Sequence, residues 1–293
     1  MKVFVIIVTY NGSQWIEKCL TSVLNASIPL ETIVIDNSST DNTVDMIEER
    51  FSGIILIKSK KNLGFGQANN IGLKYALEHQ CDYVYLLNQD AWIEPTTIET
   101  LIHLSRKNPD FGIISPMQIT PKGDKLESFF AHCCKVMIDD LYFSTLKDIY
   151  EVDDVMAAHW LITRACLMSV GGFSPVFYHY GEDNNMVERA QYHGFKCGIS
   201  PRARGVHDRE FRKLTKQQIM CFIYVAVLIG SSDIRTSRKE KIKGFIVFIY
   251  KVFLNAFRYK SLVPFLYLFK FPFMCLWIFK YNRITRKRQI SFL

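Results

Sequence analysis

Cysteine pairs in a metal-binding spacing are absent from this sequence. The eight cysteines include no C-x-x-C, and the adjacent Cys133-Cys134 suits neither an ordinary disulfide nor a zinc site. The first apolar stretch, Val3–Val8, is too short and too poorly flanked to be the core of a secretory signal. We therefore expect reduced thiols in a cytoplasmic protein.

Uninterrupted apolar runs of membrane-spanning length are also lacking. A spanning helix needs roughly 20 apolar residues. Residues 219–229 and 245–257 are shorter than that, and residues 262–279 are interrupted by two prolines and a lysine. We expect these runs to form interfacial helices, and a spanning helix over 262–279 is the alternative.

Acidic residues are scarce at one end of the chain. Residues 211–293 contain 17 lysines and arginines against 2 acidic residues, whereas residues 1–210 contain 19 against 26. The basic end also holds 18 aromatic residues. This composition is typical of a segment on an anionic membrane surface. A solvated basic face with an apolar homodimer contact is the alternative, and the dense apolar content argues against nucleic-acid binding.

Strand and helix patterns alternate over the first ninety residues. Continuous apolar runs predict buried parallel strands, and the segments between them have helical periodicity. Such alternation predicts an α/β fold with a mainly parallel sheet flanked by helices. A less regular insertion is expected over 121–154, and a helix over 160–170. The expected strands cover residues 3–9, 32–35, 54–57 and 83–87.

Polar side chains follow the carboxyl ends of three expected strands. These are Asn11, Asp36 and Asp90. Ligands of parallel sheets bind outside these ends, so the three can share one crevice. Asp90 offers a hard oxygen of the kind that Mg²⁺ or Mn²⁺ prefers. A turn at Asp36 and a helix cap at Asp90 are the alternatives.

Several motifs together resemble one enzyme family, although each alone is common. The segments are Thr9-Tyr10-Asn11, Asp36, Asn62-Leu63-Gly64-Phe65-Gly66, Asn88-Gln89-Asp90 and Gly181-Glu182-Asp183. In this order they resemble family 2 inverting glycosyltransferases of GT-A fold, over about residues 1 to 210. Asn88-Gln89-Asp90, in place of the commoner Asp-x-Asp, is most similar to the rhamnosyltransferase branch.

The resemblance implies roles for these residues. It places a divalent metal, Mg²⁺ or Mn²⁺, on Asp90 and His207, where it would stabilise the leaving diphosphate. A dinucleotide site at Gly64 is disfavoured, because Asn69 replaces the third glycine of that fingerprint. The implied nucleotide-sugar-binding residues are Thr9, Tyr10, Asn11, Asp36, Asn62, Gly64, Asn69, Asn88, Gln89 and Asp90.

The resemblance also implies the catalytic and acceptor residues. Asp183 corresponds to the general base that deprotonates the acceptor hydroxyl, and Glu182 to a neighbour that tunes it. Acidic residues that complement a helix dipole are the alternative for this pair. His159 and Trp160 are expected at the acceptor, with core packing as the alternative.

We therefore expect a catalytic domain over 1–210 and a helical, membrane-associating region over 211–293. The expected activity moves a sugar, rhamnose first, from a nucleoside-diphosphate donor to a polyprenyl-linked glycan in cell-surface polysaccharide synthesis. The expected place is the cytoplasmic face of the inner membrane, as a peripheral protein. A nucleotidyltransferase acting on sugar phosphates and a non-catalytic membrane adaptor with a degenerate site are the rival classes.

Overall fold

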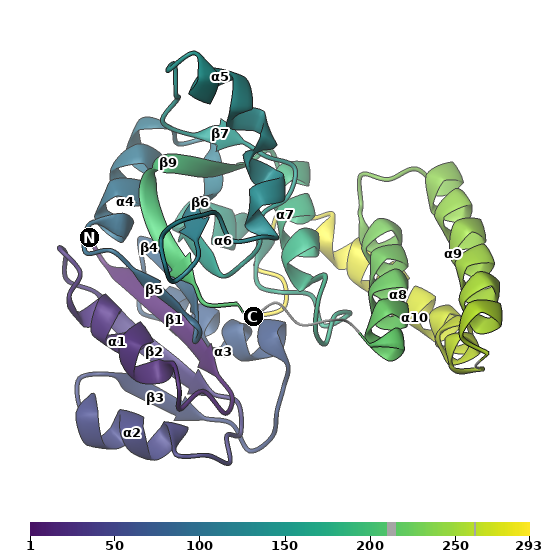
Figure 1. Ribbon diagram of the computed structural model, residues 1–293, viewed down its shortest axis with the longest axis horizontal. Coiled ribbons are helices and arrows are strands. Elements are labelled where there is room, and N and C mark those ends of the chain that lie inside the picture. Colours follow the sequence, from purple (N-terminus) through teal and green to yellow (C-terminus); the bar gives the residue numbers. More distant parts are fainter. Residues whose placement is uncertain (210–214, 261) are drawn as a thin grey trace.

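A nine-stranded sheet covered by helices forms the body of the protein, and three long helices stand to one side of it (Figure 1). The computed structural model describes residues 1–209, 215–260 and 262–293. The predicted α/β class is confirmed. The boundary expected between residues 210 and 211 falls outside the described residues, and division into two domains stays a prediction.

The first four strands are parallel, as the apolar runs predicted. Their order in the sheet is β3-β2-β1-β4. The register puts Thr9 beside Asp36 and Val8 beside Asn88, so these strands end at one edge. The strands are β1 (Val3–Thr9), β2 (Glu31–Asp36), β3 (Ile55–Lys58) and β4 (Tyr83–Asn88). The helices that connect them are α1 (Ile16–Leu24), α2 (Thr43–Arg50) and α3 (Phe65–Glu78).

Beyond β4 the sheet becomes mixed rather than mainly parallel. β8 runs antiparallel to both β4 and β6, and β5 and β7 run antiparallel to β9. Only β6 and β9 pair in parallel in this part of the described sheet. The strands are β5 (Ala91–Ile93), β6 (Phe111–Ile119), β7 (Tyr150–Glu151), β8 (His159–Thr163) and β9 (Lys196–His207).

A helix was expected over residues 160–170, but the first part of this segment is a strand. Residues 159–163 form β8, and α6 (Arg164–Val170) begins only after Thr163, whose hydroxyl accepts a hydrogen bond from the Cys166 N–H at 3.2 Å. A short apolar run fits a buried strand as well as a buried helix, and the cap at Thr163 decides where the helix begins.

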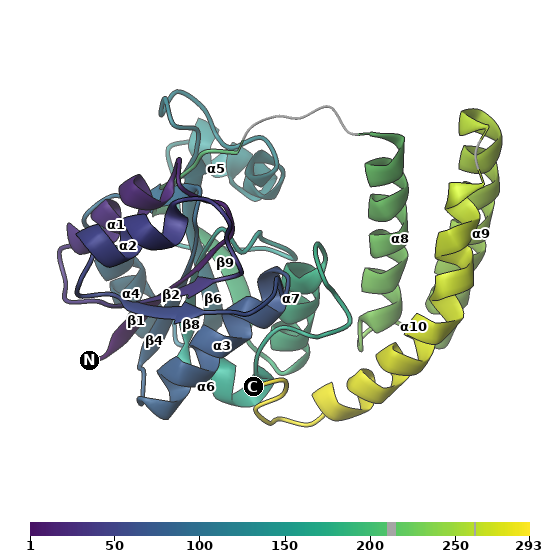
Figure 2. The ribbon, with the colours of Figure 1, turned by 90° about the horizontal axis from the view of Figure 1, so that it is seen from below.

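Helices cover both faces of the sheet, which explains why its strands are apolar throughout. In β1, Val3, Val5 and Ile7 pack on the side of α1, whereas Phe4 and Ile6 pack on the side of α3. Figure 2 shows α1 and α2 on one side of the strands and α3 and α6 on the other. Two further helices of this body are α4 (Thr97–Lys107) and α7 (Glu182–Tyr192).

The predicted irregular insertion carries an exposed apolar tip. It consists of the 3₁₀ helix η1 (Phe130–Met137) and α5 (Ile138–Tyr142), which projects from the body (Figure 1). Leu141, Tyr142 and Phe143 are at least 64% exposed. Phe130 and Met137 are buried in the core, so the base of the insertion is anchored.

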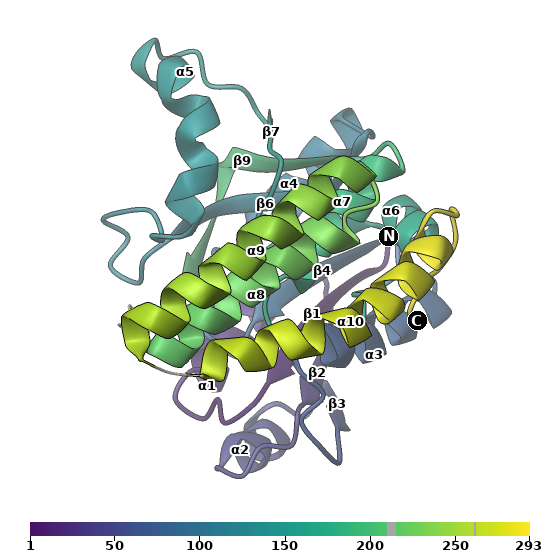
Figure 3. The same ribbon diagram turned by 90° about the vertical axis from the view of Figure 1, so that its right-hand side faces the viewer.

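The basic end forms a group of three helices. α8 (Lys216–Ser232) and α9 (Arg238–Tyr259) lie side by side, and α10 (Val263–Thr285) crosses toward the C-terminus (Figure 3). They share an apolar cluster with Val176 and Phe177, which precede α7. Among the described residues, no helix combines the length and the apolar content that crossing a membrane requires.

The last residues return to the body of the protein. The Gly172 N–H donates to the Ser291 carbonyl at 2.7 Å, and the Gln289 N–H donates to the Ser169 carbonyl at 3.1 Å. A Cβ at Gly171 would lie 2.0 Å from the Ser291 carbonyl oxygen, so only glycine fits there. The three-helix group therefore contacts the body of the protein at two places, through Val176 and Phe177 and through the returning C-terminus.

Candidate active site

A cavity of about 390 Å³ lies at the edge where β1 and β4 end. Polar side chains from segments far apart in the sequence share it, as expected for the carboxyl edge of a parallel sheet. Its lining residues are Val8, Tyr10, Asn37, Asn62, Gly64, Phe65, Asn88, Gln89, Asp90, Tyr178 and His179.

Gln89 holds the end of β1 in place. Its side-chain oxygen accepts hydrogen bonds from the Thr9 hydroxyl at 2.7 Å and the Tyr10 N–H at 2.9 Å, and its amide donates to the Tyr10 carbonyl at 3.2 Å. A Cβ at Gly12 would lie 2.3 Å from that oxygen. Thr9 is fully buried, so of the predicted motif Tyr10 alone lines the cavity.

Asn11 and Asp36 organise the loop that follows β2. Asp36 is 3% exposed and accepts a hydrogen bond from the Ser39 N–H at 3.1 Å, which is the turn role left open by the sequence. Asn11 has a positive φ of 48°, and its side-chain oxygen accepts from the Thr40 N–H at 2.8 Å. Neither residue lines the cavity. A contact of Asp36 with the nucleotide stays a prediction.

Asn37 and Asn62 shape the opposite wall. Asn37 accepts from the Leu63 N–H at 2.7 Å and donates to the Asn62 oxygen at 3.0 Å, which also accepts from the Gly64 N–H. Gly64 has a φ of +78°, and a Cβ there would lie 2.2 Å from the Tyr178 carbonyl oxygen. The close approach of two loops therefore requires glycine at this position.

Two placements in this wall differ from expectation. Asn69 is 2% exposed, and its amide donates to the Phe65 carbonyl one turn earlier in α3, so it does not line the cavity. Asn37 does line the cavity but was missed by the sequence reasoning. Its position directly after Asp36 at a strand end was the signal that could have identified it.

Asp90 and His207 meet across the pairing of β5 with β9. Ala91 pairs with His207, and the Asp208 N–H donates to the Asp90 carbonyl at 2.8 Å. This brings the His207 Nε2 to 3.6 Å from the Asp90 Oδ1. The imidazole is 4% exposed, whereas the carboxylate is 25% exposed at the cavity. The pair predicted from the sequence is thus adjacent in space.

The oxygen and nitrogen donor atoms of these side chains fit a cation whose remaining coordination positions are filled by a substrate. The described residues contain no group of three histidine, cysteine or acidic side chains that could hold a metal alone. Asp90 and His207 supply two donors, and the buried Asn88 Oδ1 has no hydrogen-bond partner in the described structure. Mg²⁺ commonly binds one or two carboxylates together with phosphate oxygens.

Glu182 and Asp183 are the first residues of α7, and they differ in how far each residue is buried. Gly181 precedes them with a φ of +88°, which turns the chain into the helix. Glu182 is 5% exposed, and its Oε2 has no hydrogen-bond partner among the described residues. Asp183 is half-buried and accepts from the Asn184 N–H at 2.8 Å. Asp183 is therefore the more exposed residue of the pair.

Burial changes the acidity of both groups. It raises the pKa of Glu182 to about 8, and the charge of Asp183 acts in the same direction. Burial also raises the pKa of Asp183, while backbone hydrogen bonds from Asn184 and Ala157 oppose the rise. Burial thus favours the neutral form of Glu182 at neutral pH, while the backbone hydrogen bonds to Asp183 favour its charged form.

One short segment links the two groups of acidic residues. The Asn88 N–H donates to the Ala158 carbonyl at 3.1 Å, and the neighbouring Ala157 hydrogen bonds to Asp183. Glu182 and Asp183 do not line the cavity, but Tyr178 and His179 from the preceding loop do. The loop that contributes Tyr178 and His179 to the cavity wall thus leads directly into α7, which begins with this carboxylate pair.

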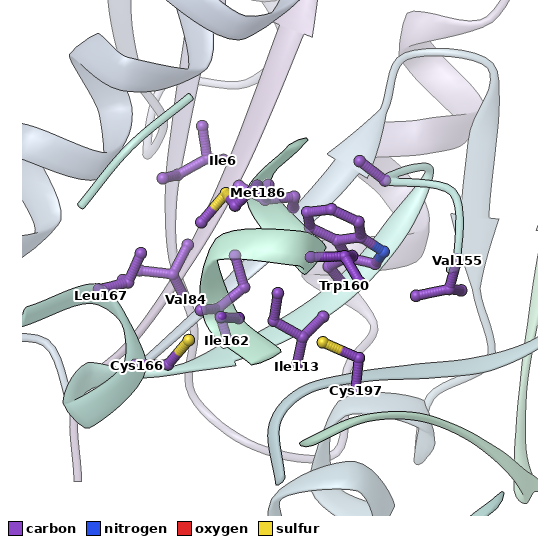
Figure 4. Close-up of a cluster of buried hydrophobic side chains, with 14 of the residues drawn as sticks. Ile6, Val84, Ile113, Val155, Trp160, Ile162, Cys166, Leu167, Met186 and Cys197 are labelled. Carbon is purple, nitrogen blue, oxygen red and sulfur yellow. The ribbon is translucent and has the colours of Figure 1, made fainter. Parts of the chain in front are cut away.

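His159 and Trp160 lie in the interior rather than at a surface. Both are fully buried, and Figure 4 shows Trp160 among Ile113, Val155 and Met186. His159 contacts the Tyr85 hydroxyl at 2.9 Å and the Val206 carbonyl at 3.0 Å. Burial lowers its pKa to about 3, and His207 acts in the same direction. The structure places both side chains as the core-packing alternative describes, and His159 supports the strand that carries His207.

Replacing Glu182 by glutamine is expected to stabilise the protein at neutral and higher pH. A carboxyl whose pKa rises on folding destabilises the fold once it ionises. The gain should be absent below pH 4.5, grow as the pH rises, and reach on the order of a few kcal/mol above about pH 8. Urea unfolding of both proteins from pH 4 to 9 measures it. A pH-independent difference would contradict the raised pKa.

Comparisons with known proteins agree with this geometry. The family model described as "Glycosyl transferase family 2" matches residues 4–140. The N-acetylglucosaminyl-diphospho-decaprenol L-rhamnosyltransferase of Mycobacterium tuberculosis is 24% identical over 233 residues, which cover 70% of this chain and 75% of that protein. The predicted family resemblance is thereby confirmed.

Solved structures confirm the GT-A fold. Staphylococcus aureus TarS 1-349, in complex with UDP, superposes with a TM-score of 0.59 at 17% identity, covering 83% of this chain and 68% of that one. GalNAc-T7 with UDP, GalNAc and Mn²⁺ has a TM-score of 0.56 at 15% identity, covering 79% and 50%. At this identity the likeness concerns the fold alone.

Proposed function

We propose that this chain transfers a sugar with inversion from a nucleoside-diphosphate donor to a lipid-linked glycan, and the match of residues 4–140 to the family 2 glycosyltransferase model supports this activity. The leading donor is deoxythymidine-diphosphate rhamnose. The relative named as a decaprenol-linked rhamnosyltransferase and the Asn88-Gln89-Asp90 motif support this choice. A uridine-diphosphate sugar is the second candidate, supported by the UDP in the TarS structure.

The observation that carries the proposal is the pair of Asp90 and His207 at one cavity, with Asp183 joined to the same strand end. Asp90 lies 3.6 Å from His207, and Asp183 hydrogen bonds to Ala157, which is next to the Ala158 carbonyl that accepts from the Asn88 N–H. The first pair would hold a Mg²⁺ or Mn²⁺ together with the donor diphosphate. When bound, such a cation stabilises the negative charge that develops on the leaving group.

Asp183 serves as the general base in this proposal. It accepts the proton of the acceptor hydroxyl while that oxygen forms a bond to the anomeric carbon of the sugar. The bond from this carbon to the diphosphate breaks on the opposite face, so the configuration inverts. Glu182, kept neutral by burial, avoids a second negative charge beside the base.

The three-helix group supports attachment to the cytoplasmic face of a membrane. Large apolar side chains recur every three or four residues along one face of α9 and of α10, and each is between 56% and 87% exposed. Lysines and arginines accompany them, as in helices that lie on anionic lipid. The residues are Ile246, Tyr250, Phe253 and Phe257 on α9, and Leu266, Phe269, Phe273 and Leu276 on α10.

A donor panel tests the proposed activity. The full chain is incubated with Mn²⁺, a polyprenyl-diphosphate-linked sugar and either deoxythymidine-diphosphate rhamnose or a uridine-diphosphate sugar, and the released nucleotide is measured. Release of nucleoside diphosphate with glycan extension is expected, fastest with rhamnose. Exchange of inorganic diphosphate into the donor would instead indicate a nucleotidyltransferase. No turnover with any donor would support the adaptor.

A further inference from the structure

A second cavity of about 510 Å³ lies within the three-helix group, far along the chain from the donor site. The first turns of α9 and the second half of α10 form its walls, and Ser231 of α8 closes one end. Phe245 of α9 and Phe271 and Ile278 of α10 together line an apolar wall. The lining also holds four exposed or partly exposed cations and no acidic side chain, namely Arg238, Lys241, Arg283 and Arg286.

The apolar wall is part of the packed core of these helices. Phe245 and Phe271 stack with ring centroids 4.8 Å apart and planes 14° from parallel. Phe271 and Ile278 are each 5% exposed, whereas Phe279 at the cavity mouth is 75% exposed. The cavity therefore has a buried apolar wall and an exposed apolar rim at Phe279, which continues the exposed apolar face of α10.

Among the described residues, none of the four cavity cations forms an ion pair with an acidic side chain. Lys241 donates from its Nζ to the Ser231 carbonyl at 2.7 Å, and burial lowers its pKa, with the charge of Arg286 acting in the same direction. Asp233 and Glu188, which oppose that shift, pair with Arg235, at 3.0 and 4.0 Å.

We propose that this cavity binds the phosphate group of an anionic membrane phospholipid, with the acyl chains against the apolar wall. An anion would relieve the repulsion among the four cations, and guanidinium groups hydrogen bond well to phosphate. The apolar wall and rim select an amphiphile over a free anion, because only an amphiphile buries them. The proposal rests on the membrane attachment proposed above but not on the sugar-transfer chemistry.

The cavity is separate from the carboxylates at the start of α7. Ile229 of α8 faces α7, since a Cβ at Gly181 would lie 3.0 Å from its Cγ1, whereas Ser231 faces the cavity. α8 thus stands between the cavity and the carboxylates that follow Gly181. A phospholipid bound here would hold the three-helix group in one orientation on the membrane without contacting these carboxylates.

Two double variants of equal charge change test the proposal in the full chain. Arg283→Gln/Arg286→Gln removes cavity cations, whereas Lys239→Gln/Lys243→Gln removes exposed cations of α9 that do not line the cavity. Binding is measured to phosphatidylglycerol vesicles by sedimentation. Thermal shifts are measured with monomeric dihexanoyl phosphatidylglycerol, dihexanoyl phosphatidylcholine or inorganic phosphate. Donor-induced thermal shifts check that each variant is folded.

We expect the cavity variant to bind vesicles at least about tenfold more weakly than the control variant, because it loses charged hydrogen bonds as well as net charge. Short-chain phosphatidylglycerol should stabilise the wild type and the control but not the cavity variant. Equal losses in both variants would mean diffuse attraction and would overturn the proposal. Equal stabilisation by inorganic phosphate would overturn it in favour of a free-anion site. Loss of donor binding would instead indicate failure of the catalytic domain.

Discussion

Asp183→Asn is expected to lower sugar transfer by at least about 10²-fold, the lower range for the loss of a general base. The amide cannot accept the proton of the acceptor hydroxyl, whereas its size and its contact with the Asn184 N–H are preserved. Donor affinity should change little, because Asp183 does not line the donor cavity. Initial rates of nucleoside-diphosphate release and donor-induced thermal shifts measure the two effects.

Glu182→Gln is the matched control for that variant. Glu182 has a pKa of about 8 and is already largely protonated at neutral pH, so its amide analogue should transfer sugar at a rate much closer to that of the wild type. If Asp183→Asn kept near-normal turnover, or if Glu182→Gln showed the larger loss, the assignment of the base would be wrong.

Asp90→Ala should lower donor affinity in the presence of Mn²⁺ by about 10²-fold, since a bound cation contributes several kcal/mol to charge stabilisation. Affinity without metal should change far less. His207→Ala should also lower donor affinity in the presence of Mn²⁺, but by a smaller factor, because imidazole is a less preferred ligand than carboxylate for these cations. Titration of the donor with and without Mn²⁺ measures both.

Asp45→Ala provides a control carboxylate. Asp45 is exposed in the first turn of α2 and does not line the cavity. This variant should keep the wild-type response to Mn²⁺. Unchanged affinity and unchanged metal dependence in Asp90→Ala would contradict a metal site at this carboxylate.

The parallel half of the sheet could be predicted because its signals are local. β1 and β4 are continuous apolar runs, and a strand buried on both faces requires that composition. Polar residues directly after these runs must then lie at one edge, and Asn88, Gln89 and Asp90 after β4 do line the cavity there. Asn11 and Asp36, expected in the same crevice, instead organise the adjoining loop.

The antiparallel half depends on contacts between distant segments, which a local pattern does not contain. β8 inserts between β4 and β6, and this insertion buries His159 and Trp160 completely. Their types suit an acceptor site and a core equally well, so only the strand order separates the two roles. The pairing of Ala91 with His207 is similarly long-range, and the resemblance to a family indicated that histidine where periodicity could not.

The return of the C-terminus was also invisible to sequence patterns. The Ser291 carbonyl accepts from the Gly172 N–H and the Phe292 carbonyl from the Asn70 side-chain amide, and such single hydrogen bonds have no periodic signature. The basic composition correctly indicated a distinct helical segment, but not that its end is docked on α6. Removing residues after 210 would expose these contacts and the buried Phe177. Point variants in the full chain are therefore the better probes of membrane binding.

The configuration of the product tests the central claim most directly. The full chain is incubated with Mn²⁺, nucleoside-diphosphate rhamnose and a lipid-linked acceptor, and the new glycoside is analysed by NMR. We predict one nucleoside diphosphate released per glycoside formed, and an anomeric configuration opposite to that of the donor. Retained configuration would contradict a single displacement assisted by Asp183 as general base.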